Sequence, residues 1–106
     1  MHKRTKAVAI PSDVKKAVEK RDQHKCIFCK ETRNVHGEAH IIARSQGGLG
    51  IEKNLVTVCR KCHDLMDNSQ ARSLYVEKAK EYMKSIYPDW NENDLVYNKW
   101  DGLKYN

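Results

Sequence analysis

Four cysteines, arranged as two Cys-x-x-Cys pairs, constrain the fold of this chain more than any other feature. The pairs are Cys26 with Cys29 and Cys59 with Cys62, and the 106 residues include no other cysteine. Two such knuckles close a tetrahedral four-thiolate site with no open position, which is typical of structural zinc. In a chain this short, Zn²⁺ would contribute folding free energy directly. A redox pair, or disulfides in an oxidising compartment, are the alternatives.

The net charge of +6 is concentrated near the start of the chain. Residues 1–30 contain nine lysines or arginines and three acidic residues, whereas residues 31–106 contain eleven of each kind. A localised basic segment is typical of proteins that bind polyanions, because lysine and arginine release the counterions condensed on phosphates. A basic arm that only improves solubility is the alternative.

The composition is that of an ordinary small globular protein, with 40% hydrophobic and 32% charged residues. No tract is apolar enough to cross a membrane. The apolar run at residues 7–10, which ends at Pro11, is too short for the core of a signal peptide. We therefore expect a single cytoplasmic domain over residues 1–106, without a membrane partner.

The residues before the first cysteine predict a basic arm and then a helix. The arm covers residues 1–11, and the helix covers residues 12–24. Ser12 is the expected N-cap, since a serine hydroxyl satisfies free backbone N–H groups at a helix start. Apolar side chains recur at helical spacing at Val14, Ala17 and Val18.

Residues 25–68 are expected to contain both cysteine pairs and the hairpin between them. Residues 34–42 favour a strand, and residues 55–58 favour a second strand that leads into the second cysteine pair. A loop at residues 45–50 separates the two, and its three glycines permit positive φ. A short helix over residues 62–67 follows.

Residues 69–106 predict a long helix and a tail. The helix covers residues 70–87, and Pro88 ends it. One helix face is apolar, which we interpret as packing against the core: Leu74, Tyr75, Ala79, Tyr82, Met83 and Ile86. The tail also has large apolar residues, which we expect to dock on the domain, a partner surface being the alternative: Trp90, Leu95, Val96, Tyr97 and Trp100.

The segment AHIIARSQGGLGIEKNLVTVCRKCH, residues 39–63, resembles the core of the HNH endonuclease family, with His40, Asn54 and His63 in the three name-giving positions. The resemblance covers residues 26–67 and includes the zinc knuckles that many members carry. It extends to small stand-alone members encoded by phages and prophages, in which a long C-terminal helix follows the motif. The implied fold is α+β: a ββα-metal core of the His-Me finger type, held together by the four-cysteine zinc site and flanked by N-terminal and C-terminal helices.

The resemblance implies a role for each of the three motif residues. His40 is the general base that takes a proton from water, a task that suits an imidazole with a pKa near neutrality. Asn54 orders the loop and orients His40. His63 is a ligand of a catalytic divalent cation, which is Mg²⁺, Mn²⁺ or another divalent ion.

Ala39 departs from the family pattern. Many members carry aspartate or histidine directly before the catalytic histidine as a second ligand of the cation, and alanine cannot ligate a metal. Residues four apart share a helix face, so Asp67 is the expected replacement beside His63. A histidine and an aspartate with waters suit Mg²⁺ or Mn²⁺. Water alone, Glu38 on the strand face of His40, and His36 are alternatives.

Several basic residues are predicted to contact the DNA backbone without reading its sequence. Arg44, at the edge of the loop, is expected near the scissile phosphate. The others are Lys3, Arg4, Lys6, Arg60 and Lys61. An ordinary surface charge is the alternative for each.

The resemblance implies a metal-dependent endonuclease that hydrolyses phosphodiester bonds and nicks or cuts duplex DNA, as a monomer or weak dimer. Two other functions remain open. One is a zinc-stabilised DNA-binding module whose nuclease site has decayed, for which Ala39 is the evidence. The other is a packaging module that works with a phage terminase.

Overall fold

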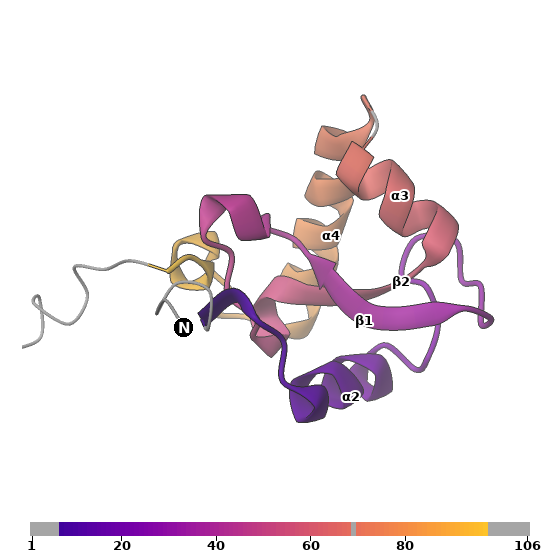
Figure 1. Cartoon of the computed structure of the whole chain (residues 1–106), viewed down its shortest axis with the longest axis horizontal. Helices are drawn as coiled ribbons and strands as arrows, with labels where there is room; N and C mark the ends of the chain where they lie inside the picture. The colour runs from indigo at the N-terminus through magenta and orange to yellow at the C-terminus, as the bar shows by residue number, and fades with distance from the viewer. Residues whose placement is uncertain (1–6, 69, 98–106) are drawn as a thin grey trace, which may run out of the picture.

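A two-stranded antiparallel sheet lies between one helix on one side and two helices on the other (Figure 1). The computed structural model describes residues 7–68 and 70–97. The helices and strands are α2 (Ser12–Arg21), β1 (Val35–His40), β2 (Leu55–Cys59), α3 (Arg60–Asn68) and α4 (Arg72–Ile86). Single 3-10 turns are η1 (Arg44–Gln46), η2 (Glu52–Asn54) and η3 (Glu92–Leu95). The predicted α+β class is confirmed.

The hairpin of β1 and β2 forms the centre of the core. Val35 pairs with Cys59 at one end and His40 pairs with Leu55 at the other, with an irregularity between His36 and Ala39. Every residue of β2 is buried, and α3 begins directly after it. The buried core cluster consists of Cys26, Ala39, Ile41, Val56, Val58, Cys59, Cys62, Met66, Ala79, Met83, Trp90 and Leu95.

Helix α2 starts differently from the sequence prediction. Pro11, not Ser12, is the N-cap, and no side chain caps the helix. The Pro11 carbonyl accepts the first helical hydrogen bond, from the N–H of Lys15 at 3.1 Å. Pro11 fits this place because its ring fixes φ near the observed −62° and its missing N–H needs no partner. The helix ends at Arg21, before the predicted end at His24.

The buried carboxylate of Asp22, directly after α2, connects this helix to the hairpin and to α4. The Asp22 side chain accepts hydrogen bonds from the Thr57 N–H at 2.8 Å and from the Tyr82 hydroxyl at 2.6 Å. Arg21 donates to the same carboxylate at 2.8 and 3.0 Å and to the Leu55 carbonyl at 2.7 Å. The side chain of Asp22 is fully buried, so these donors balance the cost of removing its charge from water.

The glycine-rich loop needs its glycines for two different reasons. Among the described glycines only Gly47 has a positive φ, of 83°. A Cβ at Gly48 would collide with the carbonyl of Ile42, and one at Gly50 would collide with the carbonyl of Ala9. The prediction of positive φ therefore holds for Gly47, while close backbone approach explains the other two.

Helix α4 packs against the core through Ala79 and Met83, both fully buried. Leu74 does not join them, because 56% of its surface is exposed, so its placement on the packed face was wrong. Leu74 lies five residues before Ala79, a spacing that does not repeat on one helix face, whereas Tyr75 lies four residues before it and packs against the core.

The tail after α4 docks on the domain, as predicted. Trp90 and Leu95 are buried, and the Trp90 indole N–H donates to the Lys53 carbonyl at 2.7 Å. The Leu95 carbonyl accepts from the N–H of Leu49 at 2.8 Å, which supports the glycine-rich loop. Trp100 lies outside the described residues.

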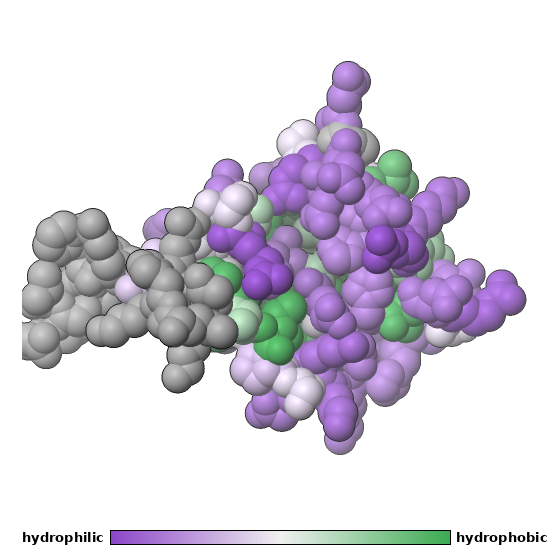
Figure 2. All heavy atoms as spheres, in the orientation of Figure 1, coloured by the Kyte–Doolittle hydropathy of each residue, from purple (hydrophilic) through white to green (hydrophobic). Residues whose placement is uncertain are grey.

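The surface is mostly hydrophilic on the face shown in Figure 2, with small hydrophobic areas between polar side chains. Within residues 7–68 and 70–97, no helix combines the length and apolar character needed to cross a membrane.

Candidate active site and metal centre

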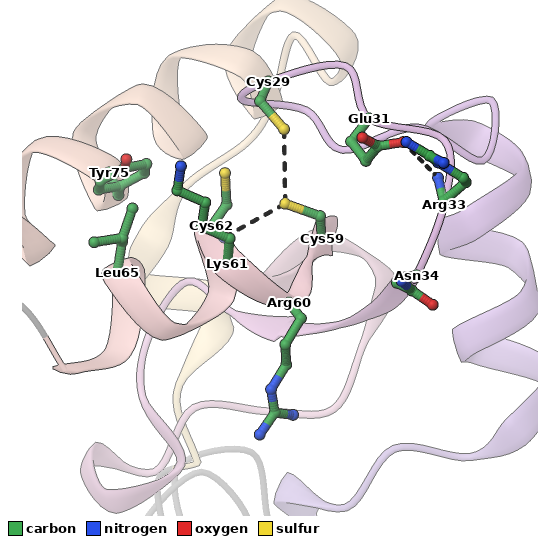
Figure 3. Close-up of a pocket in the computed structure, with 10 residues that line it drawn as sticks. All are labelled: Cys29, Glu31, Arg33, Asn34, Cys59, Arg60, Lys61, Cys62, Leu65 and Tyr75. Atoms are coloured by element: carbon green, nitrogen blue, oxygen red, sulfur yellow. Dashed lines mark hydrogen bonds and ion pairs between the residues drawn. The ribbon is translucent and has the colours of Figure 1, made fainter.

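The two cysteine pairs meet at one point. The sulfur atoms of Cys26, Cys29, Cys59 and Cys62 all lie within 4.8 Å of one another. Those of Cys29 and Cys59 are 3.6 Å apart. Figure 3 shows the side chains of Cys29, Cys59 and Cys62 directed toward a common point. The predicted assembly of these residues into one cluster that can bind a metal ion is confirmed.

Backbone hydrogen bonds hold each cysteine pair in place. In the first pair, the Cys26 carbonyl accepts from the Lys30 N–H at 2.9 Å, and the Ile27 N–H donates to the Thr57 carbonyl on β2 at 3.0 Å. The second pair occupies the junction of β2 and α3. Burial raises the pKa of the Cys62 thiol. Four thiolates in this space therefore need a cation, and a soft sulfur set of this kind fits zinc.

A separate pocket of about 500 Å³ lies among β1, η1, α3 and the start of α4. Four residues predicted from the sequence line it, namely His40, Arg44, His63 and Asp67. Glu38, which the sequence offered as an alternative ligand, also lines it, and the remaining lining residues are Ile10, Ala43, Ser45, Gln46 and Arg72. The fold thus gathers side chains from a strand, a loop and a helix around one open space.

His63 and Asp67 are close enough to act together. The Nε2 atom of His63 is 3.0 Å from a carboxylate oxygen of Asp67, one helical turn further along α3. The other ring nitrogen of His63, Nδ1, is 2.8 Å from Nε2 of His36. Burial lowers the pKa of His36, and the charge of His63 lowers it further. His36 does not line the pocket and lies behind the His63 ring.

His40 is held rigidly and is only 7% exposed. Its Nε2 lies 3.1 Å from the Val8 carbonyl. Because a carbonyl can only accept, Nε2 carries the proton of this bond, and the lone pair of the neutral ring is on Nδ1. Burial lowers the pKa of His40, against the hydrogen bond to Val8, and the positive charge of Arg44 lowers it as well. The contact with Val8 has no signal in the sequence.

The strand beside the pocket presents Glu38 and His40 to it, while Ala39 is fully buried in the core. An aspartate at position 39 would therefore enter the core on this backbone. Glu38 is the strand carboxylate that does reach the pocket, and it pairs with Lys15 at 2.7 Å. The hydrogen bond from Lys15 lowers the pKa of Glu38.

Asn54 is fully buried outside the pocket and fixes the loop that leads away from His40. Its side-chain oxygen accepts from the Ile42 N–H at 2.8 Å. Its amide nitrogen donates to the carbonyls of Ile42 at 3.2 Å and Leu49 at 2.8 Å. The two ends of the glycine-rich segment are thereby held together.

Arg72 is a pocket residue that the sequence analysis missed. Its Nη1 donates to the Met66 carbonyl at 2.8 Å and lies 3.6 Å from a carboxylate oxygen of Asp67. It is five residues beyond Asp67 on a different helix. No spacing rule links the two positions, so only the turn between α3 and α4 reveals the contact.

The other predicted DNA contacts are not in this pocket. Arg60 and Lys61 line a pocket of about 700 Å³ beside the cysteine cluster, and Figure 3 shows Arg60 directed away from the sulfurs. The predicted contacts Lys3, Arg4 and Lys6 lie outside the described residues.

The donors in the pocket at His40 suit a cation held partly by solvent or substrate. Within the described parts of the chain, the cysteines are the one group of three or more His, Cys, Asp or Glu ligands packed this closely. His63 and Asp67 offer one imidazole nitrogen and one carboxylate oxygen beside open space. This set fits a borderline or hard divalent ion with free coordination positions.

One family model matches the chain. It describes an HNH endonuclease and covers residues 26–75. No curated protein and no solved structure matches the chain. The matched span includes both cysteine pairs, the hairpin, α3 and the first residues of α4, and it excludes α2 and the tail.

Proposed function

We propose that this protein is a metal-dependent endonuclease that hydrolyses phosphodiester bonds of DNA, since residues 26–75 match the model of an HNH endonuclease. The observation that supports this most is the single pocket lined by His40, His63 and Asp67. The pocket offers a base and a pair of possible metal ligands on one side of an open space. Phosphodiester hydrolysis requires these elements.

His40 acts as the general base in this proposal. The Val8 carbonyl binds the Nε2–H, so Nδ1 takes the proton from the attacking water. Burial favours the neutral form of the ring because it lowers the pKa of His40. Asn54 supports His40 indirectly, because it fixes the loop that follows the strand.

His63 and Asp67 hold the catalytic divalent cation, which we assign as Mg²⁺ or Mn²⁺. When bound, the cation supplies positive charge to the phosphate and to the departing oxygen. The structure supports this pair by the 3.0 Å approach of the His63 and Asp67 side chains. Glu38 also lines the pocket, where it pairs with Lys15 at 2.7 Å.

Positive side chains around the pocket position the DNA. Arg44 and Arg72 line it and can bind phosphate oxygens beside the scissile bond. Arg60 and Lys61, beside the cysteine cluster, and the basic arm before residue 7 extend this contact along the backbone. Phosphate contacts of this kind position the duplex without reading its sequence.

The four cysteines hold a structural Zn²⁺ in this proposal. Four cysteine ligands complete the tetrahedral coordination of the ion, so no position remains for substrate. Thiolate ligands persist where the surroundings are reducing, which agrees with a cytoplasmic site of action. The zinc thus stabilises the fold, and the pocket at His40 performs the reaction.

Plasmid nicking tests the proposal. Zinc-loaded protein is incubated with supercoiled plasmid in Mg²⁺, in Mn²⁺ and in EDTA, and nicked and linear products are quantified on gels. We expect conversion with either cation and none with EDTA. A complete absence of metal-dependent cleavage would exclude the proposed activity.

Asp67→Asn and Asp64→Asn form a matched pair for the metal site. Both residues are on α3, but Asp64 pairs with Arg60 at 3.6 Å and does not line the pocket. We expect Asp67→Asn to need more Mn²⁺ for half-maximal nicking and to recover part of its rate at high Mn²⁺. Asp64→Asn should match the wild type, and equal metal responses in both variants would refute the assignment of Asp67.

A further inference from the structure

The ring of His63 has a partner at each nitrogen. Nε2 lies 3.0 Å from Asp67 on the pocket side. Nδ1 lies 2.8 Å from Nε2 of His36, within hydrogen-bond distance. The centres of the two rings are 5.0 Å apart, and their planes are tilted by 49°. One side of His63 therefore faces the proposed cation, and the other side is occupied by a second imidazole.

A histidine that binds a metal through one ring nitrogen uses the other in a hydrogen bond that fixes the orientation and tautomer of the ring. Backbone carbonyls, carboxylates and water are the usual partners. For His63 the partner is the ring of His36. Nothing in the spacing of the motif required a residue at this position.

We propose that His36 is a positioning residue that orients His63 toward the catalytic cation. The inference rests on the proposed function and deepens it. His36 does not line the pocket, so it acts through His63 and does not touch the substrate.

An imidazole suits this position because it can bond to His63 in either protonation pattern. When His63 carries its proton on Nε2 and donates to Asp67, its Nδ1 accepts from the Nε2–H of His36. When the Nε2 lone pair of His63 faces a cation, Nδ1–H donates to the Nε2 lone pair of His36. Neutral His36 meets both needs by changing tautomer, so His63 keeps its orientation in both states.

The backbone places His36 accurately. It pairs with Val58 of β2, next to Val35, which pairs with the metal-binding residue Cys59. The regular pairing is interrupted between His36 and Ala39, before the strand reaches His40. His36 therefore belongs to the part of the hairpin adjoining the cysteine cluster, and its side chain extends from there to α3.

Three substitutions of His36 distinguish a hydrogen bond to His63 from simple packing against its ring. Gln places an amide near the position of Nε2 and can donate or accept. Phe keeps a ring of similar size without a hydrogen-bonding atom. Asn is polar but too short to reach His63, so it serves as a second negative variant if Phe disturbs folding.

The measurement is the Mn²⁺ affinity of zinc-loaded full-length protein, obtained by titration calorimetry, together with the nicking rate across Mn²⁺ concentrations. We expect His36→Phe and His36→Asn to bind Mn²⁺ about 10–100-fold more weakly, the usual effect of removing such a partner. Their nicking rates at saturating Mn²⁺ should approach that of the wild type. His36→Gln should bind Mn²⁺ nearly as well as the wild type.

Zinc content and thermal unfolding midpoints serve as controls for intact folding. If the wild type nicks DNA but His36→Phe and His36→Asn bind Mn²⁺ with unchanged affinity, the role of His36 is overturned and the proposed function is not. Equal losses in Gln, Phe and Asn would also overturn it, since a hydrogen bond would then not be the cause. A wild-type protein that neither binds Mn²⁺ nor nicks DNA would overturn the proposed function, and this inference with it.

Discussion

The His40 ring is fixed by the backbone carbonyl of Val8, a residue far from it in the sequence. Val8 is buried and accepts from Nε2 at 3.1 Å. Holding the ring in this way places the lone pair of neutral His40 on Nδ1 and gives it a defined direction. The sequence predicts a histidine on a strand, but it cannot predict the partner, because the contact joins residues 32 positions apart.

Arg44 should set the acidic limit of activity. Burial lowers the pKa of His40, and the charge of Arg44 lowers it further. The neutral ring is the active base, so activity should persist below the ordinary histidine pKa of about 6.5. In Arg44→Gln the pKa of His40 rises, and the acidic limb of the rate against pH should move to higher pH.

Single-turnover nicking rates between pH 5 and pH 8, about the range over which histidine titrates, measure this limb. Arg33→Gln is the control, because Arg33 is exposed beside the cysteine cluster and does not line the pocket. A limb at the same pH in Arg44→Gln and the wild type would contradict the electrostatic role of Arg44, whatever the change in maximal rate.

At the scale of elements, a buried ion pair determines where α2 lies. Asp22 joins α2 to β2 through Thr57 and to α4 through Tyr82. Arg21 adds bonds to the main-chain carbonyls of Glu52 and Leu55. These polar contacts, and not only the apolar stripe of α2, place the helix against the hairpin.

Asp22→Ala should destabilise the protein strongly. Arg21 would lose its charge partner, and the Thr57 N–H and the Tyr82 hydroxyl would lose their acceptor. Removing one partner of a buried ion pair lowers the free energy of unfolding by about 3–5 kcal/mol. Urea denaturation of zinc-loaded protein measures the change in the free energy of unfolding.

The exposed pair of Lys53 and Asp89, at 3.4 Å, provides the control. Asp89→Ala should cost no more than about 1 kcal/mol, since exposed pairs contribute little. Similar losses in Asp22→Ala and Asp89→Ala would show that the buried carboxylate does not anchor α2.

The elements themselves could be predicted where the signal is local. The cysteine spacing, the glycine-rich loop and the stop at Pro88 depend on neighbouring residues, and the order of strand, loop, strand and helix follows from them. The N-cap at Pro11 was missed because serine is the commoner capping residue. Leu74 was misplaced because it lies five residues before the buried Ala79, a spacing that does not return to the same helix face.

The lining of the candidate site could be predicted only in part. His40, His63 and Asp67 follow from the family motif and from helical spacing, and they line one pocket. Arg72, the Val8 carbonyl and the bond of His36 to His63 depend on how separate elements pack. No periodicity in the sequence encodes such contacts.

At the scale of the whole molecule, the cysteine cluster joins the two halves of the domain. The first pair precedes β1, and the second lies where β2 becomes α3. His63 directly follows Cys62. A metal bound at the cluster would therefore fix the start of the helix that carries the proposed ligands of the catalytic cation.

Removal of this metal should unfold the protein. We expect about one zinc per chain after purification, as a four-cysteine site requires, and a loss of helical circular dichroism when a strong chelator extracts it. Added Mg²⁺ should not restore the structure, because thiolates bind it poorly. A metal-free chain with an unchanged spectrum and unfolding midpoint would contradict a structural role for the cluster.

In the proposed reaction His40 takes the proton of the attacking water, and the nicking rate of a variant without this imidazole tests that role. The measurement compares single-turnover nicking by the wild type and by His40→Ala, both zinc-loaded and at saturating Mn²⁺, with and without added imidazole. A general base contributes about 10²–10⁴-fold, so the variant should be slower by that factor, and imidazole should restore part of the rate. Nicking by His40→Ala at the wild-type rate would contradict the account.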